Sequence, residues 1–293
     1  MRRKILTTVL VGAIFVLMSG AHAQENTMQG EYAPVNGLNL YYEVHGTGGE
    51  PLILLHGGLG GIVEFAPILP LLAETRQVIA VELQGHGHTA DIDRPLTFEN
   101  MADDVAALID YLGLEHADIL GYSLGGGVAL QTAIRHPEVV HKLVLISTSF
   151  RSSGIHPEFK AGMAQMSAES AQMMLETPMY QFYSSVAPRV EAWAALVDKL
   201  GTLLREDYDW SEQAAQVTTP TLIVHGDSDW LPPSEAVALF GLLGGGVAGG
   251  FAPPSTSQLA ILPNTIHFTI MSRTDLLMPI ITPFLDAPAQ QAP

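Results

Sequence analysis

The stretch Gly121-Tyr122-Ser123-Leu124-Gly125-Gly126 decides the fold of this chain. It follows the mostly apolar run 117–120 and precedes residues 126–135, which we expect to form a helix. A G-x-S-x-G pentapeptide between a strand and a helix is typical of a sharp turn that exposes the serine hydroxyl. Glycines two residues before and after the serine suit this turn, because it brings the strand and helix backbones close together. The pattern predicts that Ser123 is a nucleophile; the alternative is a glycine-rich helix start with a capping serine.

Composition bounds the class of protein. The chain has 293 residues, of which 47% are hydrophobic and 15% charged, so we expect one large globular domain or one domain with an insertion. It contains no cysteine, which excludes disulfides, a thiolate nucleophile and cysteine-ligated zinc. The net charge of −17 argues against nucleic acid and anionic membranes as partners and favours a neutral or cationic small molecule.

Residues 1–23 have the pattern of a cleaved secretory signal. Basic residues at positions 2–4 precede the apolar run 5–18, which is too short to span a bilayer comfortably, and Ala21-His22-Ala23 offers small residues for cleavage. We therefore expect an exported protein, periplasmic or secreted, without stable membrane association after cleavage. The alternative is an uncleaved N-terminal anchor.

The rest of the chain alternates between strand and helix patterns. We expect residues 24–33 to be a mobile leader. Strands are expected over 38–44, 51–55, 77–81, 117–120, 142–146, 221–224 and 257–262, and helices over 63–74, 98–112, 126–135, 234–243 and within 271–285. This alternation predicts a parallel sheet with right-handed crossovers, built from residues 30–150 and 213–287.

Residues 151–212 interrupt the alternation. They contain no buried-strand run and are rich in methionine and aromatic residues, so they predict a helical cap beside the strand ends. We expect Met174, Tyr180 and Trp193 of this cap, together with Tyr122, to line a substrate pocket above Ser123. The alternative is that these side chains form the core of the cap itself, since methionine commonly fills gaps.

Further candidate residues follow other strands. Ligands bind beyond the carboxyl ends of the strands in such a sheet. A serine hydroxyl needs a base to take its proton, and His267, after the last strand, is the candidate because histidine titrates near neutral pH. Asp229 is the candidate to orient the imidazole and stabilise its charged form. The backbone N–H groups of Gly58 and Leu124 are the candidates for an oxyanion hole.

Together these motifs resemble the small esterases of the α/β-hydrolase superfamily. The resemblance rests on His56-Gly57-Gly58, the Ser123 pentapeptide, Gly226-Asp227-Ser228-Asp229 and His267, and it spans nearly all of the chain after residue 23. It implies a mostly parallel central sheet flanked by helices, with a helical cap insertion. It also implies a serine hydrolase that cleaves a carboxylic ester or lactone through an acyl-enzyme without a cofactor. In G-D-x-D the second carboxylate, Asp229, resembles the family's acid, and Asp227 is expected to brace the turn.

A finer resemblance concerns residues 82–95. The run from Glu82 to Asp91, followed by Arg94-Pro95, is similar to exported hydrolases related to macrolide esterases. The apolar side chains of the cap independently predict a bulky, apolar ester or lactone, neutral or cationic, which a macrolide-type lactone would fit. Relatives often carry an arginine where this chain has Gln84, so an ion pair found in them is expected to be absent. His86 and His88 lack a third ligand at matching spacing, so no metal site is expected.

Some other functions of the fold are compatible with these residues and some are not. Ser123 argues against haloalkane dehalogenases and epoxide hydrolases, which place aspartate at this turn, and the absence of cysteine argues against the dienelactone-hydrolase type. A C–C bond hydrolase, an amidase, a perhydrolase and a non-catalytic ligand-binding protein are alternatives on the same residues. The glycine-rich stretch 241–250 lacks the lysine of a phosphate-binding loop and is expected to be a flexible loop.

Overall fold

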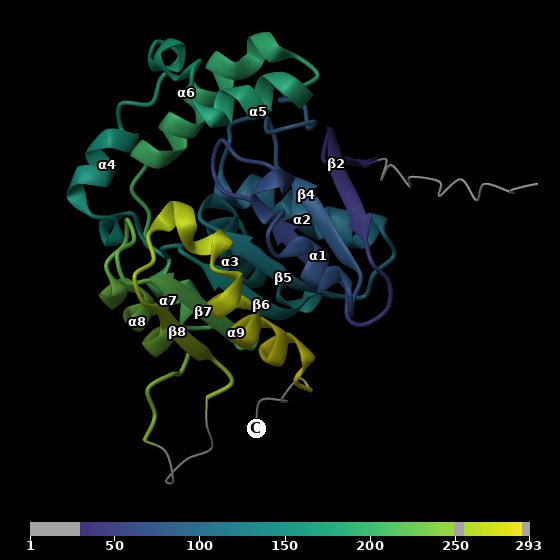
Figure 1. Ribbon diagram of the computed structural model, residues 1–293, viewed down its shortest axis with the longest axis vertical. Coiled ribbons are helices and arrows are strands. Elements are labelled where there is room, and N and C mark those ends of the chain that lie inside the picture. Colours follow the sequence, from purple (N-terminus) through teal and green to yellow (C-terminus); the bar gives the residue numbers. More distant parts are fainter. Residues whose placement is uncertain (1–29, 249–254, 289–293) are drawn as a thin grey trace, which may run out of the picture.

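A mostly parallel sheet forms the centre of the molecule, as expected. The computed structural model describes residues 30–248 and 255–288, so the predicted signal segment and part of the glycine-rich stretch lie outside it. The sheet has eight strands in the order β1-β2-β4-β3-β5-β6-β7-β8, and every pairing from β4 to β8 is parallel (Figure 1). The strands are β1 Glu31–Val35, β2 Leu38–His45, β3 Leu52–Leu55, β4 Val78–Glu82, β5 Ala117–Tyr122, β6 Val140–Ile146, β7 Thr221–Gly226 and β8 Gln258–Leu262.

The leader expected over 24–33 is wrong for its last residues. Residues 31–33 belong to β1, which pairs antiparallel with β2. The connecting residues Asn36 and Gly37 have φ values of 48° and 84°, the positive angles that a two-residue type I′ hairpin requires. An Asn-Gly pair between two strands is a strong hairpin signal, so the sequence did carry the evidence for β1.

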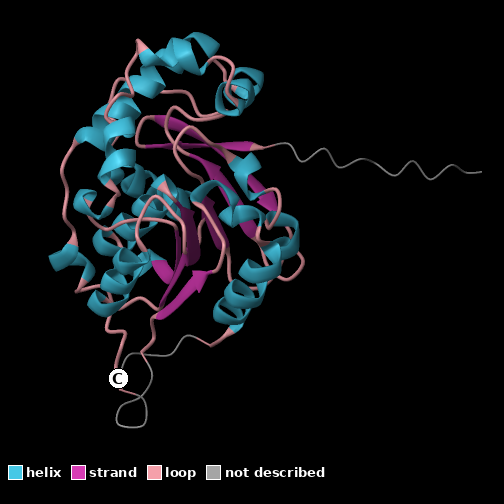
Figure 2. Cartoon of the chain, turned by 60° about the vertical axis from the view of Figure 1, so that its left-hand side comes forward, coloured by secondary structure: helices cyan, strands magenta, loops and turns pink. Residues whose placement is uncertain are grey.

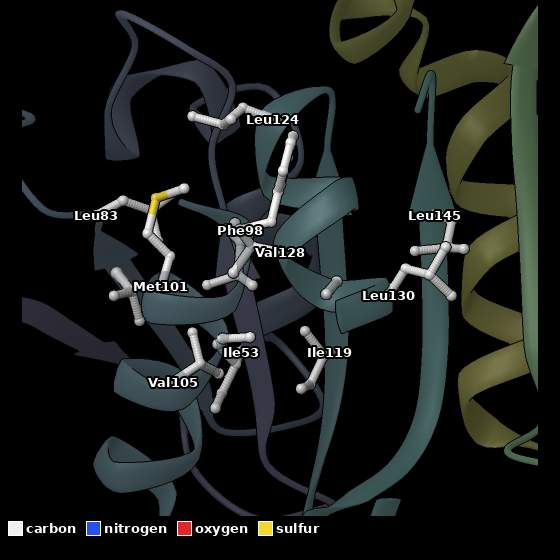
Figure 3. Packing of buried hydrophobic residues seen from close by; sticks show 14 of the residues in the cluster. Ile53, Leu83, Phe98, Met101, Val105, Ile119, Leu124, Val128, Leu130 and Leu145 are labelled. Atoms are coloured by element: carbon white, nitrogen blue, oxygen red, sulfur yellow. The ribbon is translucent and has the colours of Figure 1, made fainter. Parts of the chain in front are cut away.

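Helices cover both faces of the sheet. One buried cluster joins the sheet to α2 Phe98–Tyr111, α3 Leu124–Arg135 and α8 Pro233–Leu242, and a second joins it to α1 Leu69–Ala73 and α9 Thr274–Asp286. Figure 3 shows Met101 and Val105 of α2 and Val128 of α3 packed over Ile53 and Ile119. Burying each such side chain stabilises the fold by about 1.5–3 kcal/mol. The inner strands β3 and β4 therefore read as nearly continuous apolar runs, because both of their faces are buried.

Prolines and caps set the helix boundaries. The helix expected over 63–74 is divided into a 3₁₀ helix, Ile62–Phe65, and α1. Pro67 and Pro70 explain the division, since each lacks the N–H that a continuous helix over 63–74 would need. Pro70 is compatible with α1 itself, because it lies in the first turn of that helix. Thr97 caps α2 by accepting a hydrogen bond from the Asn100 N–H at 3.0 Å, as its sequence position predicts.

The segment between β6 and β7 is helical. It contains α4 Pro157–Met163, α5 Pro178–Val186, α6 Trp193–Arg205 and α7 Ser211–Ala214, with short 3₁₀ helices at Ser152–Gly154, Ser170–Met174 and Val190–Ala192. Figures 1 and 2 show α5 and α6 gathered at one end of the molecule, beyond the strands. Over the described ranges, no helix combines the length and the apolar character needed to cross a bilayer.

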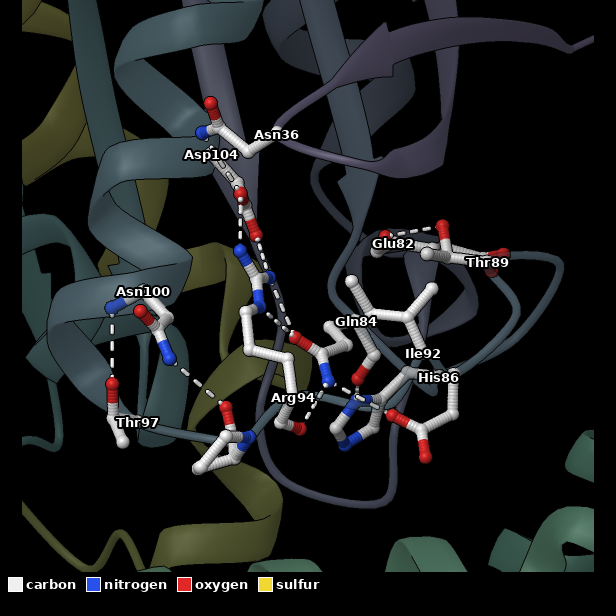
Figure 4. Close-up of polar contacts among 12 residues, drawn as sticks. Asn36, Glu82, Gln84, His86, Thr89, Ile92, Arg94, Thr97, Asn100 and Asp104 are labelled. Atoms are coloured by element: carbon white, nitrogen blue, oxygen red, sulfur yellow. Dashed lines mark hydrogen bonds and ion pairs between the residues drawn. The ribbon is translucent and has the colours of Figure 1, made fainter.

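An ion pair holds the loop after β4 to α2. Figure 4 shows Arg94 donating to both carboxylate oxygens of Asp104, at 3.1 and 2.5 Å, and to the side-chain oxygen of Gln84, at 2.6 and 2.9 Å. Asn36 donates to the same carboxylate at 3.1 Å. The loop thus has a partly buried ion pair although position 84 is not arginine, because Arg94 reaches back to that position.

Candidate active site

The structure brings Ser123, His267 and Asp229 into one line of hydrogen bonds. His267 Nε2 lies 3.0 Å from Ser123 Oγ, and His267 Nδ1 lies 2.7 Å from Asp229 Oδ1. The three residues follow β5, β8 and β7, whose carboxyl ends meet at one edge of the parallel sheet. A carboxylate only accepts hydrogen bonds, so Nδ1 carries the hydrogen and Nε2 is free to accept the serine proton.

Ser123 occupies a strained turn. Its φ of 53° and ψ of −116° lie outside the regions that a residue with a side chain favours. The turn leaves no room for side chains beside the serine, since a Cβ on Gly121 would lie 2.2 Å from Gly125 O and one on Gly125 would lie 2.1 Å from Leu55 O. The Ser123 N–H donates to Ile146 O at 2.9 Å, which holds the turn to the neighbouring strand.

The two predicted oxyanion donors border the cavity beside Ser123. Leu124 is the first residue of α3, where backbone N–H groups have no partner inside the helix. The Gly125 N–H donates to His56 O, and the N–H groups of Gly126 and Gly127 donate to Ser123 O, so they are already engaged. Gly58 approaches from the loop after β3. An oxyanion bound here would also lie at the positive end of the α3 dipole.

The carboxylate of Asp229 is well supported. It accepts hydrogen bonds from Ser147 Oγ at 2.6 Å and from the Trp230 N–H at 2.6 Å, in addition to His267. Burial raises the pKa of Asp229, but the hydrogen bonds from His267 and Ser147 outweigh it and hold that pKa below its ordinary value. The sequence reasoning missed Ser147, which follows β6 directly and so reaches the same sheet edge.

Asp227 has a different environment from Asp229. Its exposed carboxylate accepts from the N–H groups of Asn264 and Thr265 at 2.8 and 3.1 Å, and these bonds lower its pKa. It therefore ties the end of β7 to the loop that precedes His267, as expected of a residue that braces the turn.

A cavity of about 270 Å³ lies in front of Ser123. Tyr122 and Met174 line it, as predicted. Tyr180 and Trp193 are not among the lining residues, which corrects that expectation: the Trp193 side chain is 3% exposed and donates to Ala171 O at 3.2 Å. The ring of Tyr180 lies 5.4 Å from that of Trp193, so both belong to the core of the cap. The apolar cavity wall instead comes from Met163, Met166, Met174, Met179, Leu200 and Leu204.

Aromatic side chains beside His267 complete the cavity wall. The Trp230 ring stacks on the His267 ring with 4.0 Å between centroids and 9° between planes, and Phe268 lies next to both. Both aromatic residues line the cavity. The sequence reasoning missed them, although each directly follows a predicted catalytic residue.

Glu64 supports the loop that carries Gly58. Its Oε2 accepts a hydrogen bond from the Gly57 N–H at 2.7 Å, and a Cβ on Gly60 would lie 2.4 Å from its carboxyl carbon. Burial raises the pKa of Glu64 to about 7. This acid at the cavity wall was not predicted, because only the folded loop brings it under Gly57.

His56 shapes the same loop from the other side. The Leu83 N–H donates to His56 Nε2 at 3.0 Å, so Nδ1 carries the hydrogen and donates to Gly57 O at 2.7 Å. Burial lowers the pKa of His56 to about 3. His86 contacts Gln84 O and His88 contacts Glu82, so the two do not face a common point. Within the part of the chain that the structure describes, no group of three or more potential ligands could hold a metal ion.

Comparisons with known proteins agree with this architecture. Residues 50–176 match the family model described as alpha/beta hydrolase fold. The mouse serine hydrolase BPHL is 32% identical over 206 residues, covering 68% of this chain and 70% of that protein. The bifunctional esterase/perhydrolase DCH of Acinetobacter calcoaceticus is 28% identical over 226 residues, covering 68% and 82%.

Other matches are shorter or show the fold alone. The chain spans 46% of the dihydrolipoyllysine-residue acetyltransferase component of the acetoin cleaving system of Pseudomonas putida, at 32% identity over 176 residues. The crystal structure of the enol-lactonase from Burkholderia xenovorans LB400 superposes with a TM-score of 0.66 at 22% identity, covering 87% of this chain and all of that one. The sheet, the turn at Ser123 and these relatives together show that the chain belongs to the α/β-hydrolase family.

Proposed function

We propose that this hydrolase cleaves a carboxylic ester or lactone through an acyl-enzyme formed on Ser123. The observation that carries the proposal is the hydrogen-bonded line from Ser123 through His267 to Asp229 at the wall of a cavity. A strained serine, a base within reach and an oriented carboxylate are the parts that nucleophilic acyl transfer requires.

The reaction proceeds in two halves. Ser123 Oγ attacks the carbonyl carbon while His267 Nε2 takes its proton, and the N–H groups of Gly58 and Leu124 stabilise the resulting oxyanion. His267 then gives the proton to the leaving alkoxide as the C–O bond breaks, which leaves an acyl group on Ser123. A water molecule attacks this acyl group in the same way and releases the carboxylic acid. Asp229 stays ionised and stabilises the charged imidazole throughout.

The cavity supports a bulky, apolar substrate, of which a macrolide-type lactone is one example. Methionine, leucine and aromatic side chains form most of its wall, and small-molecule sites are mostly apolar with a few polar groups. The name of the esterase/perhydrolase relative supports ester substrates.

The test is hydrolysis of an ester, lactone, amide and C–C substrate panel by the purified protein and by Ser123→Ala. We expect ester or lactone turnover with an initial burst of alcohol, and no burst in the variant. Turnover of the amide or the C–C substrate alone would replace the proposed reaction, and unchanged activity in Ser123→Ala would exclude the serine mechanism.

We also propose that the protein is exported, which the basic and then apolar pattern of residues 1–23 supports. Mass spectrometry of the exported protein should give an N-terminus near Gln24. An intact Met1 in that fraction would contradict the proposal.

A further inference from the structure

We propose that Phe268 and Trp230 form a subsite for the alcohol part of the substrate, and that the preferred substrates carry a flat aromatic group on that side of the ester bond. This inference rests on the proposed acyl transfer at Ser123 and deepens it by assigning a substrate class.

His267 determines which side of the cavity receives the alcohol. The leaving oxygen must take its proton from His267 Nε2, so the alcohol part lies next to this ring when the C–O bond breaks. The carbonyl oxygen points in another direction, toward the N–H groups of Gly58 and Leu124. The acyl chain takes the remaining direction from the tetrahedral carbon.

The wall on the His267 side is aromatic. The Trp230 ring is stacked on His267, and the Phe268 ring stands nearly perpendicular to both, at 83° to Trp230 and 89° to His267. The centroid of the Phe268 ring is 4.9 Å from that of Trp230 and 5.8 Å from that of His267. A planar group that enters beside His267 therefore meets aromatic side chains, which favour stacked or edge-to-face contact with another ring.

Phe268 has surface to offer, because it is 59% exposed and still lines the cavity. Trp230, in contrast, is already packed against His267, Phe268 and Phe159, whose ring stacks on it at 5.3 Å. A side chain that lines an apolar cavity and still has free surface can contact a ligand there, since such sites are lined largely by hydrophobic and aromatic side chains. The exposure of Phe268 also shows that the fold does not need this ring for its core.

The other wall of the cavity differs in kind. Leu200 of α6 reaches the oxyanion loop, with its methyl carbons 3.1 and 3.7 Å from the position of a Cβ on Gly58. Met166, Met174 and Met179 line the same cavity as Leu200. Methionine side chains are flexible and adapt to irregular shapes, so this wall suits aliphatic acyl chains of various lengths. We therefore assign the aromatic residues beside His267 to a flat alcohol part of the substrate, and the methionine and leucine side chains to a flexible acyl part.

The test uses four esters that combine two acyl groups with two alcohols. The acyl groups are acetyl and hexanoyl, and the alcohols are 2-phenylethanol and 1-butanol, both alkyl alcohols of similar leaving ability. We expect Phe268→Ala to lower the ratio of kcat/KM for phenylethyl over butyl esters about tenfold, the lower end of what one missing apolar contact contributes to discrimination. The kcat/KM ratio for hexanoyl over acetyl esters should stay unchanged in Phe268→Ala. Compared with Phe268→Ala, Phe268→Leu should restore kcat/KM more for the butyl esters than for the phenylethyl esters.

Two further variants serve as comparisons. Ile266→Ala removes a side chain that is 47% exposed, two residues before Phe268 and not among the lining residues, and it should change neither ratio. Met174→Ala should change the acyl ratio alone. If Phe268→Ala leaves the alcohol ratio unchanged, or shifts both ratios equally, the subsite assignment is wrong while ester hydrolysis by Ser123 stands. If the folded wild-type protein hydrolyses none of the four esters, the subsite assignment is refuted, and the substrate panel described above decides the proposed function.

Discussion

Glu64 gives this protein a pH-dependent stability that a single substitution should remove. Burial raises its pKa from 4.5 to about 7 in the folded protein, and the difference corresponds to about 3 kcal/mol of folding free energy. Because the folded-state pKa of this acid is raised, the carboxyl favours folding when protonated. Its contribution is therefore complete below about pH 4.5 and is lost as the pH rises through about 7.

Glu64→Gln keeps a side-chain oxygen that can accept the hydrogen bond from the Gly57 N–H, but its amide group cannot ionise. We expect the variant to be up to about 3 kcal/mol more stable than the wild type at pH 8, and the difference to shrink toward pH 5. The Tyr122 phenol faces the same carboxyl, and its pKa is raised first by burial and then by the Glu64 charge, so it stays neutral over this range. Urea unfolding of both proteins from pH 5 to pH 8 measures the difference.

Two comparisons test the reasoning. Glu74→Gln, at an exposed glutamate that ends α1, reports the effect of removing one surface charge. Glu64→Ala removes the hydrogen bond to Gly57 and should lower kcat more than Glu64→Gln, because the loop that carries the Gly58 donor loses its support. A stability difference between Glu64→Gln and the wild type that does not vary between pH 5 and pH 8 would refute the assignment of the buried ionisation to Glu64.

The remaining predictions concern the catalytic line and the cap. Ser123→Ala and His267→Ala should fold normally and lose turnover to a similar extent, since nucleophile and base act as a unit, as steady-state rates at matched circular dichroism would show. Asp229→Asn should lower kcat by about 10⁴-fold, because it favours the wrong imidazole tautomer of His267. Asp227→Asn should mainly lower the melting temperature. A larger loss of kcat in Asp227→Asn than in Asp229→Asn would exchange their roles. Trp193→Ala should destabilise the protein by about 3–5 kcal/mol in denaturant unfolding and leave the ranking of substrates unchanged, because its side chain fills the cap core. A changed ranking of substrates at unchanged stability would indicate that the Trp193 side chain contacts the substrate.

Local sequence patterns predicted most of the fold. The run 51–55 is apolar on both faces, which identifies a buried parallel strand, and Thr97 marks the start of α2. The helix expected over 63–74 is wrong although the sequence contains the signal for its division, namely Pro67 and Pro70. These features depend on the backbone preferences of neighbouring residues, so the sequence determines them without knowledge of the folded chain.

The order of the site residues could likewise be predicted, because the ends of parallel strands meet at one edge of the sheet whatever the loops between them do. The candidates Ser123, His267 and Asp229 follow from that rule. Only the tertiary structure decided which other side chains reach them: Ser147 on Asp229, and Trp230 on His267. The packing of α5 and α6 likewise decided that Tyr180 and Trp193 face each other rather than the cavity. The physical reason is that a side chain's neighbours depend on how distant elements pack, and a pattern of local preferences does not encode that packing.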